Sequence, residues 1–168
     1  MNKLTMIISV CTLLLVQSIF AQEPPKSPKA TAEGKGVKIT YGQPSKRGRV
    51  IFGELVPFGQ VWRTGANEAT QITFDKDATF AGKDVKAGTY TLFTIPNKDK
   101  WTIILNSKLG QWGAYDYDKN KASNVLTADV PVTTASEMTE KLTLSFDDKG
   151  LNIVWDMTKV IIPVSVKM

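Results

Sequence analysis

Short stretches in which apolar and polar residues alternate recur along most of this chain, and Gly, Pro, Asn or Asp separates most of them from the next. Side chains on a strand point to opposite faces in turn, so a two-residue period predicts a strand with one buried face. No stretch shows a convincing 3.6-residue period, which would indicate an amphipathic helix. The chain is therefore predicted to be all-β, an antiparallel β-sandwich or jelly roll of about eight strands.

Particular residues support this strand pattern. Residues 89–95 and 101–106 are rich in β-branched and aromatic side chains and are separated by a polar turn, which predicts a hairpin. Pro163 cannot donate to a strand ladder, so the last strand is expected to be bent or to lie at a sheet edge. Trp101 and Trp155 fall in register with apolar neighbours and are predicted core residues. The predicted strands include residues 37–41, 71–74, 89–95, 101–106, 125–132, 140–148 and two parts of 151–166.

The N-terminal part of the chain is predicted to lie outside this domain. A lysine, an apolar run over 4–20 and a small residue at the cut are typical of a signal peptide, here residues 1–21. An uncleaved anchor is the alternative, because the run is near the lower length limit for a membrane span. Residues 22–36 are rich in Pro and Lys and lack large apolar side chains, which predicts a disordered linker before a β-sandwich domain over 37–168. We expect export to the periplasm or beyond, with no membrane span after cleavage.

Missing residue types restrict the chemistry more than those present. The chain has no histidine, and its one cysteine, Cys11, lies within the predicted signal peptide. The commonest general base and the commonest zinc ligand are therefore lacking. Residues 116–120 alternate oxygen-bearing side chains but lack the glycine and distal glutamate of a calcium loop, so no metal and no cofactor are predicted. The net charge of +5 is spread along the chain, which does not favour a nucleic-acid partner.

Two irregular segments interrupt the strands, and both combine aromatic with polar residues. The first, residues 48–70, contains four glycines, which permit close approaches and unusual backbone conformations. The second is residues 107–124. If the fold brings them together, flat aromatic surfaces surrounded by hydrogen-bonding groups would suit a glycan or another small polar ligand. The predicted ligand-binding residues are Trp62, Arg63, Asn67, Glu68, Gln111, Trp112 and Tyr115.

A purely structural interpretation of the same residues stays open. Trp62 and Trp112 would then plug the ends of the sandwich, because buried aromatics are commoner than binding platforms. Arg63 would pair with Glu68, and Asn67 would cap a turn.

Catalysis without histidine or cysteine would depend on carboxylates. Glu54 and Glu68 lie in the first irregular segment, and Asp116 and Asp118 follow Trp112, so a paired-carboxylate hydrolase can be considered. The spacing fixes no distance between these groups. No catalytic residue is assigned.

Several stretches together carry a family resemblance: residues 47–70, containing VWRTGANEAT, and residues 87–96, 101–106 and 110–115. In these stretches the chain resembles a secreted bacterial family catalogued as domain of unknown function 2911. The resemblance implies an exported, largely β domain and no particular activity. The leading hypothesis is a non-enzymatic binding module for a glycan or small polar ligand. The alternative is a structural or protein-interaction component of the cell envelope.

Overall fold

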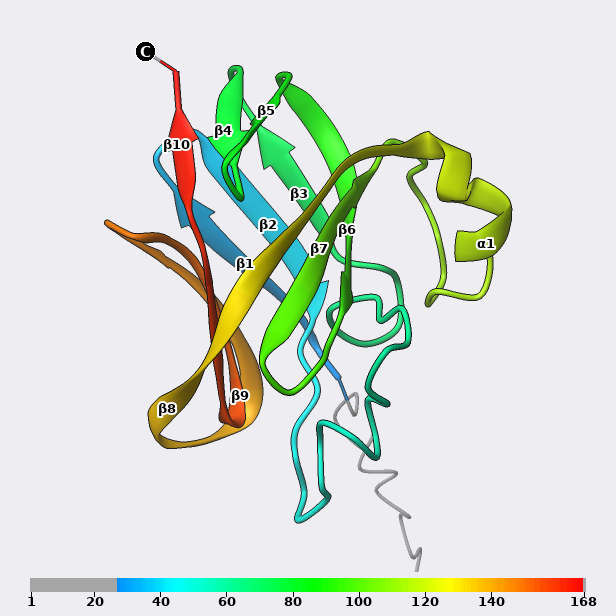
Figure 1. Ribbon diagram of the computed structural model, residues 1–168, viewed down its shortest axis with the longest axis vertical. Helices are drawn as coiled ribbons and strands as arrows, with labels where there is room; N and C mark the ends of the chain where they lie inside the picture. The colour runs from blue at the N-terminus through cyan, green and yellow to red at the C-terminus, as the bar shows by residue number, and fades with distance from the viewer. Residues whose placement is uncertain (1–26, 168) are drawn as a thin grey trace, which may run out of the picture.

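The computed structural model describes residues 27–167, which form strands, turns and one short helix (Figure 1). The helix α1 (Tyr117–Asn120) continues into a 3₁₀ turn, η1 (Lys121–Ser123). The strands are β1 (Lys29–Gly34), β2 (Val37–Gly42), β3 (Gln71–Phe74), β4 (Ala78–Phe80), β5 (Lys83–Val85), β6 (Gly88–Ile95), β7 (Lys100–Asn106), β8 (Asn124–Asp147), β9 (Gly150–Ile162) and β10 (Val164–Val166).

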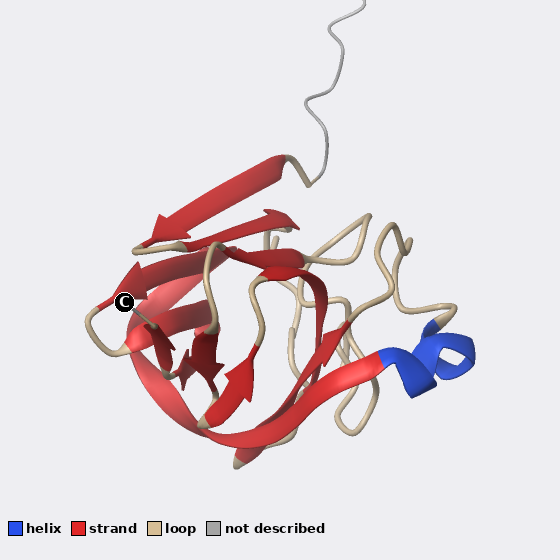
Figure 2. Cartoon of the chain, turned by 90° about the horizontal axis from the view of Figure 1, so that it is seen from above, coloured by secondary structure: helices blue, strands red, loops and turns tan. Residues whose placement is uncertain are grey.

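The strands form two antiparallel sheets. Seven lie in the order β1-β2-β3-β6-β7-β8-β9, and β10-β4-β5 make a small second sheet. Viewed from above, the larger sheet curls around the interior (Figure 2). The long strand β8 carries much of this curvature, because its first part pairs with β7 and its second part with β9, with register shifts between Thr134 and Thr143. The predicted antiparallel, sandwich-like all-β fold is confirmed.

An aromatic cluster lies in the core. Trp101 and Trp155 are only 1% and 2% exposed, which confirms both as core residues. Trp62 stacks on Trp155 with ring centroids 6.1 Å apart and planes at 18°. Phe52 meets both of these indoles edge-on. Each buried aromatic removes about 150–250 Å² from water, so this cluster stabilises the fold strongly.

The predicted hairpin is present as β6 and β7. Pro163 separates β9 from β10, so the chain bends there and passes from the large sheet to the small one. The predicted strands 125–132 and 140–148 are parts of one strand, β8, because bulges let a strand bend without ending.

The disordered linker predicted for 22–36 is wrong for residues 29–34. These residues form β1, which pairs along its whole length with β2. Ala30 and Ala32 pack against the core, and the backbone ladder supplies the stability that larger side chains would have given. The short strands β4 and β5 were also not predicted.

The predicted signal peptide, residues 1–21, lies outside the described residues. Within 27–167, no helix has both the length and the apolar character needed to cross a membrane.

Candidate functional site

Residues 62–69, here called the dividing segment, line two separate depressions in the surface, one with residues 62–66 and the other with residues 67–69. The segment is tied to β6, because Trp62 and Thr94 exchange backbone hydrogen bonds of 2.7 and 2.9 Å. It is tied to β2 as well, where the Ala66 amide donates to the Gly42 carbonyl at 3.1 Å. A Cβ at position 42 would lie 2.0 Å from the Ala66 carbonyl oxygen, so this close approach requires glycine. The segment is thus held from two sides.

A left-handed residue fixes the turn inside the dividing segment. Thr64 has φ +57° and is fully buried. Such a conformation is unusual for a β-branched residue and persists only where the surroundings enforce it. The Thr64 hydroxyl shares a 3.1 Å hydrogen bond with that of Thr94, and the Thr70 hydroxyl donates to the Thr64 carbonyl at 2.9 Å. These hydrogen bonds hold the backbone at Thr64 and so restrict the directions in which the neighbouring side chains leave it.

The two irregular segments meet, as the binding hypothesis requires. Glu68 and Trp112 form an isolated antiparallel bridge. The Ala69 amide donates to the Gln111 carbonyl at 2.9 Å, and the Gly113 amide donates to the Asn67 carbonyl at 3.0 Å.

A cleft of about 150 Å³ lies where these segments meet, and we call it the Trp112 cleft. Trp112 forms part of its wall and is 60% exposed. The amide nitrogen of the Asn67 side chain donates to the Ser27 carbonyl at 3.1 Å. The polar side chains that line the cleft are Lys29, Thr40, Tyr41, Asn67, Glu68 and Gln71.

Three other predicted residues do not line this cleft. Trp62 is 8% exposed, and its indole N–H donates to the Gly65 carbonyl at 3.1 Å, so it belongs to the core. Gln111 is buried and donates to the Lys108 carbonyl at 2.8 Å, which fastens the loop. Tyr115 is 80% exposed and its ring lies against Gly113.

Arg63 does not line the Trp112 cleft either. It lines a second depression of about 250 Å³, here called the arginine pocket, together with Arg47, Arg49 and the indoles of Trp62 and Trp155. The predicted Arg63–Glu68 pair is not among the ion pairs of residues 27–167. The predicted site is therefore divided between two places.

A family model described as a protein of unknown function, DUF2911, matches residues 23–164. The chain belongs to the DUF2911 family. The match includes β1 and both depressions, and it confirms the resemblance carried by residues 47–70. No curated protein and no solved structure gives a significant match to the chain.

Sequence reasoning missed several residues of this DUF2911 chain that line the two depressions. Lys29 falls in the predicted linker, but β1 pairs it with Gly42 of β2, and it lines the Trp112 cleft. Arg47 and Arg49, which line the arginine pocket, are not among the predicted ligand-binding residues. Their close spacing with Lys46 was the signal that could have indicated the arginine pocket.

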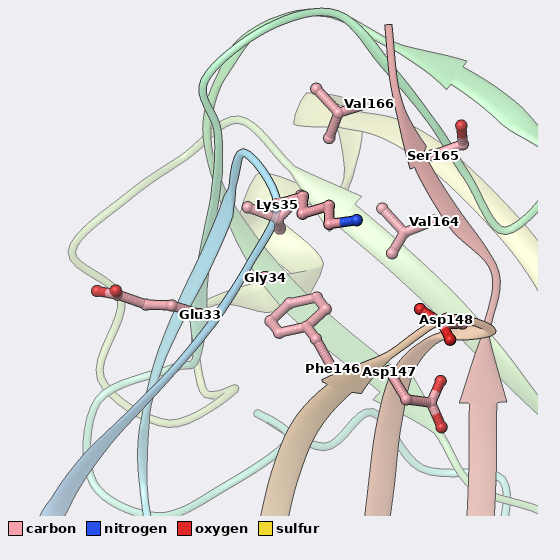
Figure 3. Close-up of a pocket in the computed structure, with 10 residues that line it drawn as sticks. Glu33, Gly34, Lys35, Phe146, Asp147, Asp148, Val164, Ser165 and Val166 are labelled. Carbon is pink, nitrogen blue, oxygen red and sulfur yellow. The ribbon is translucent and has the colours of Figure 1, made fainter.

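A larger cavity of about 430 Å³ lies between the β1–β2 turn, the β8–β9 turn and β10 (Figure 3). Phe146, Val164 and Val166 line it, and its acidic residue Asp147 stabilises the β8–β9 turn. The amides of Lys149 and Gly150 donate to Asp147 at 2.8 and 3.2 Å, and these bonds hold the pKa of Asp147 below its usual value.

The carboxylates considered for hydrolysis are spread over the surface. Glu68 alone of the four lines one of the depressions described above. Asp116 forms an ion pair with Lys119 at 2.9 Å. Glycoside hydrolysis generally uses two carboxyl groups, about 5–10 Å apart, on either side of the scissile bond. In the described part of the chain, no group of three acidic, histidine or cysteine residues is placed to hold a metal ion.

Proposed function

We propose that this DUF2911 chain is a binding module for a carbohydrate, which it holds in the Trp112 cleft. The observation that carries the proposal is the exposure of Trp112: an indole that is 60% exposed sits at the edge of a cleft lined with polar side chains. Tryptophan is enriched at binding surfaces, because it offers a large flat apolar ring together with an N–H donor.

The chemistry of the cleft suits a sugar ring. The flat indole can stack on the C–H face of a pyranose, while the hydroxyl groups at its edge need donors and acceptors. Glu68 offers carboxylate oxygens, Lys29 offers ammonium protons, and Gln71 offers both an acceptor and donors. This combination fits a neutral sugar better than a purely apolar molecule.

The size of the cleft limits what it can enclose. Its volume of about 150 Å³ is below the range of about 300–1,000 Å³ found for pockets that bury drug-sized ligands. One sugar unit would therefore occupy the cleft, and the rest of a longer glycan would lie outside it.

Titration with defined oligosaccharides tests this proposal. We would use cellopentaose and the pentamer of N-acetylglucosamine within a wider glycan panel, and follow binding by calorimetry and amide chemical shifts. Trp112→Ala should weaken binding by about thirtyfold or more, the cost of removing a central aromatic anchor of about 2 kcal/mol. Trp112→Phe should retain part of the affinity.

Tyr115→Ala is the matched control, since Tyr115 is an exposed aromatic on the same loop but does not line the cleft. Absence of saturable binding across the panel, or equal losses from the Trp112 and Tyr115 variants, would contradict the proposal.

A protein partner is the second candidate, because Leu109, Trp112 and Tyr115 are 43%, 60% and 80% exposed within one loop. Aromatic residues are enriched at protein interfaces. This candidate predicts that Tyr115→Ala and Leu109→Ala weaken binding to the partner as much as Trp112→Ala does, and that no oligosaccharide competes.

We also propose that the chain acts outside the cytoplasm. The lysine, apolar run and small residue at the N-terminus support export. Fractionation and mass spectrometry of the N-terminus should find the protein outside the cytoplasm and beginning at Gln22. An intact N-terminus in a cytoplasmic fraction would contradict this proposal.

A further inference from the structure

The first part of the dividing segment lines the arginine pocket and its last part lines the Trp112 cleft, and the two depressions differ in chemistry. Its volume of about 250 Å³ is bounded by three arginines, Arg47, Arg49 and Arg63, and by the apolar walls of Trp62 and Trp155. Three cations at the rim of one depression repel one another unless an anion lies between them.

The acidic residues near this pocket have other partners. Asp156 pairs with Lys46 at 3.2 Å. The carboxylate of Glu140 accepts a hydrogen bond from the backbone amide of Arg47 at 2.8 Å. None of the ion pairs found among residues 27–167 involves an arginine. The positive charge of the pocket is thus not neutralised by a carboxylate partner from the described part of the chain.

The guanidinium group of Arg49 and the backbone of Arg63 are held in place by the fold. Arg49 donates from Nε to the Lys46 carbonyl at 3.0 Å and from Nη2 to the Ser45 carbonyl at 2.6 Å. Arg63 precedes the left-handed Thr64, and its carbonyl accepts a hydrogen bond from the Thr70 amide at 3.1 Å. Groups fixed before binding lose little conformational entropy when a ligand arrives.

The Nε–H of Arg63 is unpartnered within the described part of the chain. This nitrogen is buried, yet it has no hydrogen-bond acceptor within residues 27–167. Buried donors are nearly always satisfied by protein or water, so this proton is available to an acceptor that residues 27–167 do not supply. The guanidinium Nε and Nη protons form a fork that matches two oxygens of a carboxylate or phosphate.

We propose that the arginine pocket binds a tetrahedral oxyanion, a phosphate or sulfate group, with Arg63 at its base and Arg47 and Arg49 at its rim. Two oxygens of the anion would accept from the Arg63 fork, and the remaining oxygens would face the two rim arginines. This site is independent of the carbohydrate proposal, since the two depressions have no lining residue in common.

Titration with inorganic phosphate tests the proposal, with the Arg63 Nε–H resonance followed by ¹⁵N NMR at constant ionic strength set with chloride. We expect a saturable shift of this resonance with phosphate and none with added chloride. Parallel titrations use sulfate, glucose 6-phosphate and a sulfated disaccharide. They show whether the anion belongs to a phosphate ester, to a sulfated glycan or to neither. Acetate should bind more weakly, because it offers two oxygens instead of four.

Arg63→Gln removes the fork and should weaken phosphate binding by about ten- to a hundredfold, the effect of losing hydrogen bonds to a charged group. Arg63→Lys keeps the charge but not the fork, so it should recover little of the loss. Arg47→Gln provides a variant at an exposed position, where the fold is not at risk, and should weaken binding to a smaller extent. Amide spectra of each variant report whether it has folded.

Lys98→Gln is the matched control, because it removes an exposed positive charge that does not line the pocket. Its phosphate affinity should equal that of the parent protein. The proposal is overturned if phosphate gives no saturable shift, or if Arg47→Gln and Lys98→Gln reduce the affinity equally, which would indicate general charge attraction.

Discussion

Trp62 and Trp112 both lie in irregular segments, beside glycines and polar residues, yet the fold uses them in opposite ways. Trp62 is 8% exposed and stacks on Trp155, whereas Trp112 is 60% exposed beside a cleft. Their backbone partners account for the difference. Trp62 bridges to Thr94 inside the sheet, and Trp112 bridges to the exposed Glu68. The partner of each bridge, and not the composition of the loop, decides which tryptophan can meet a ligand.

Replacing each tryptophan with alanine should give the largest contrast. Trp62→Ala opens the aromatic core and should lower the free energy of unfolding by about 3–5 kcal/mol. Trp112→Ala acts at an exposed position and should change it by no more than about 0.5 kcal/mol. Urea denaturation measures both. Equal losses would mean that Trp112 is also a core residue and would remove the basis of the carbohydrate proposal.

The contact between Gly42 and Ala66 should matter next most, because it places the dividing segment against β2. A Cβ at position 42 would lie 2.0 Å from the Ala66 carbonyl oxygen, so Gly42→Ala must displace backbone. We expect a loss of about 1–3 kcal/mol, typical of overpacking, together with weaker binding at both depressions. Denaturation and the two ligand titrations measure these effects. Unchanged stability would show that the segment is not held by this contact.

Gln111→Ala should have a smaller effect on stability, and it should change binding in the Trp112 cleft but not in the arginine pocket. The Gln111 side chain donates to the Lys108 carbonyl and accepts a 3.3 Å hydrogen bond from Asn120, which stiffens the loop that carries Trp112. Loss of these bonds should cost about 1 kcal/mol. Carbohydrate affinity should fall while phosphate affinity stays constant. A matching fall in phosphate affinity would contradict the separation of the two sites.

The sequence was sufficient to predict the sandwich-like fold, because alternation and turn residues are local signals. It was not sufficient to place β1, whose small side chains carry no strand signal and whose stability comes from pairing with β2. The candidate site was predicted in part. Asn67, Glu68 and Trp112 do meet at one cleft, but nothing local to Arg63 shows that Thr64 turns it away from them. The distant partners Lys29 and Arg49 are brought in by tertiary structure alone.

The smallest expected effect is the contribution of Asp129 to the pH dependence of stability. Neither binding site should be involved. Lys100, at 2.6 Å, and then Thr102 donate to Asp129 and hold the pKa of its carboxyl below the usual 3.8. A lowered pKa in the folded state stabilises the protein above pH 3.8, and the contribution is lost as the pH falls through the folded value.

Asp129→Asn should therefore lower the melting temperature slightly at neutral pH. The melting temperature of the variant should then fall less steeply than that of the parent protein as the pH is lowered. Melting curves between neutral pH and strong acid measure this. Since Asp129 lines neither the Trp112 cleft nor the arginine pocket, both ligand affinities should be unchanged at neutral pH.

The most direct test of two separate sites is a crossed titration, in which Trp112→Ala and Arg63→Gln are each titrated with the best oligosaccharide of the panel and with inorganic phosphate. We predict that Trp112→Ala loses carbohydrate binding and keeps phosphate binding, and that Arg63→Gln does the reverse. If either folded variant loses both ligands in parallel, the dividing segment does not separate two sites and the account is wrong.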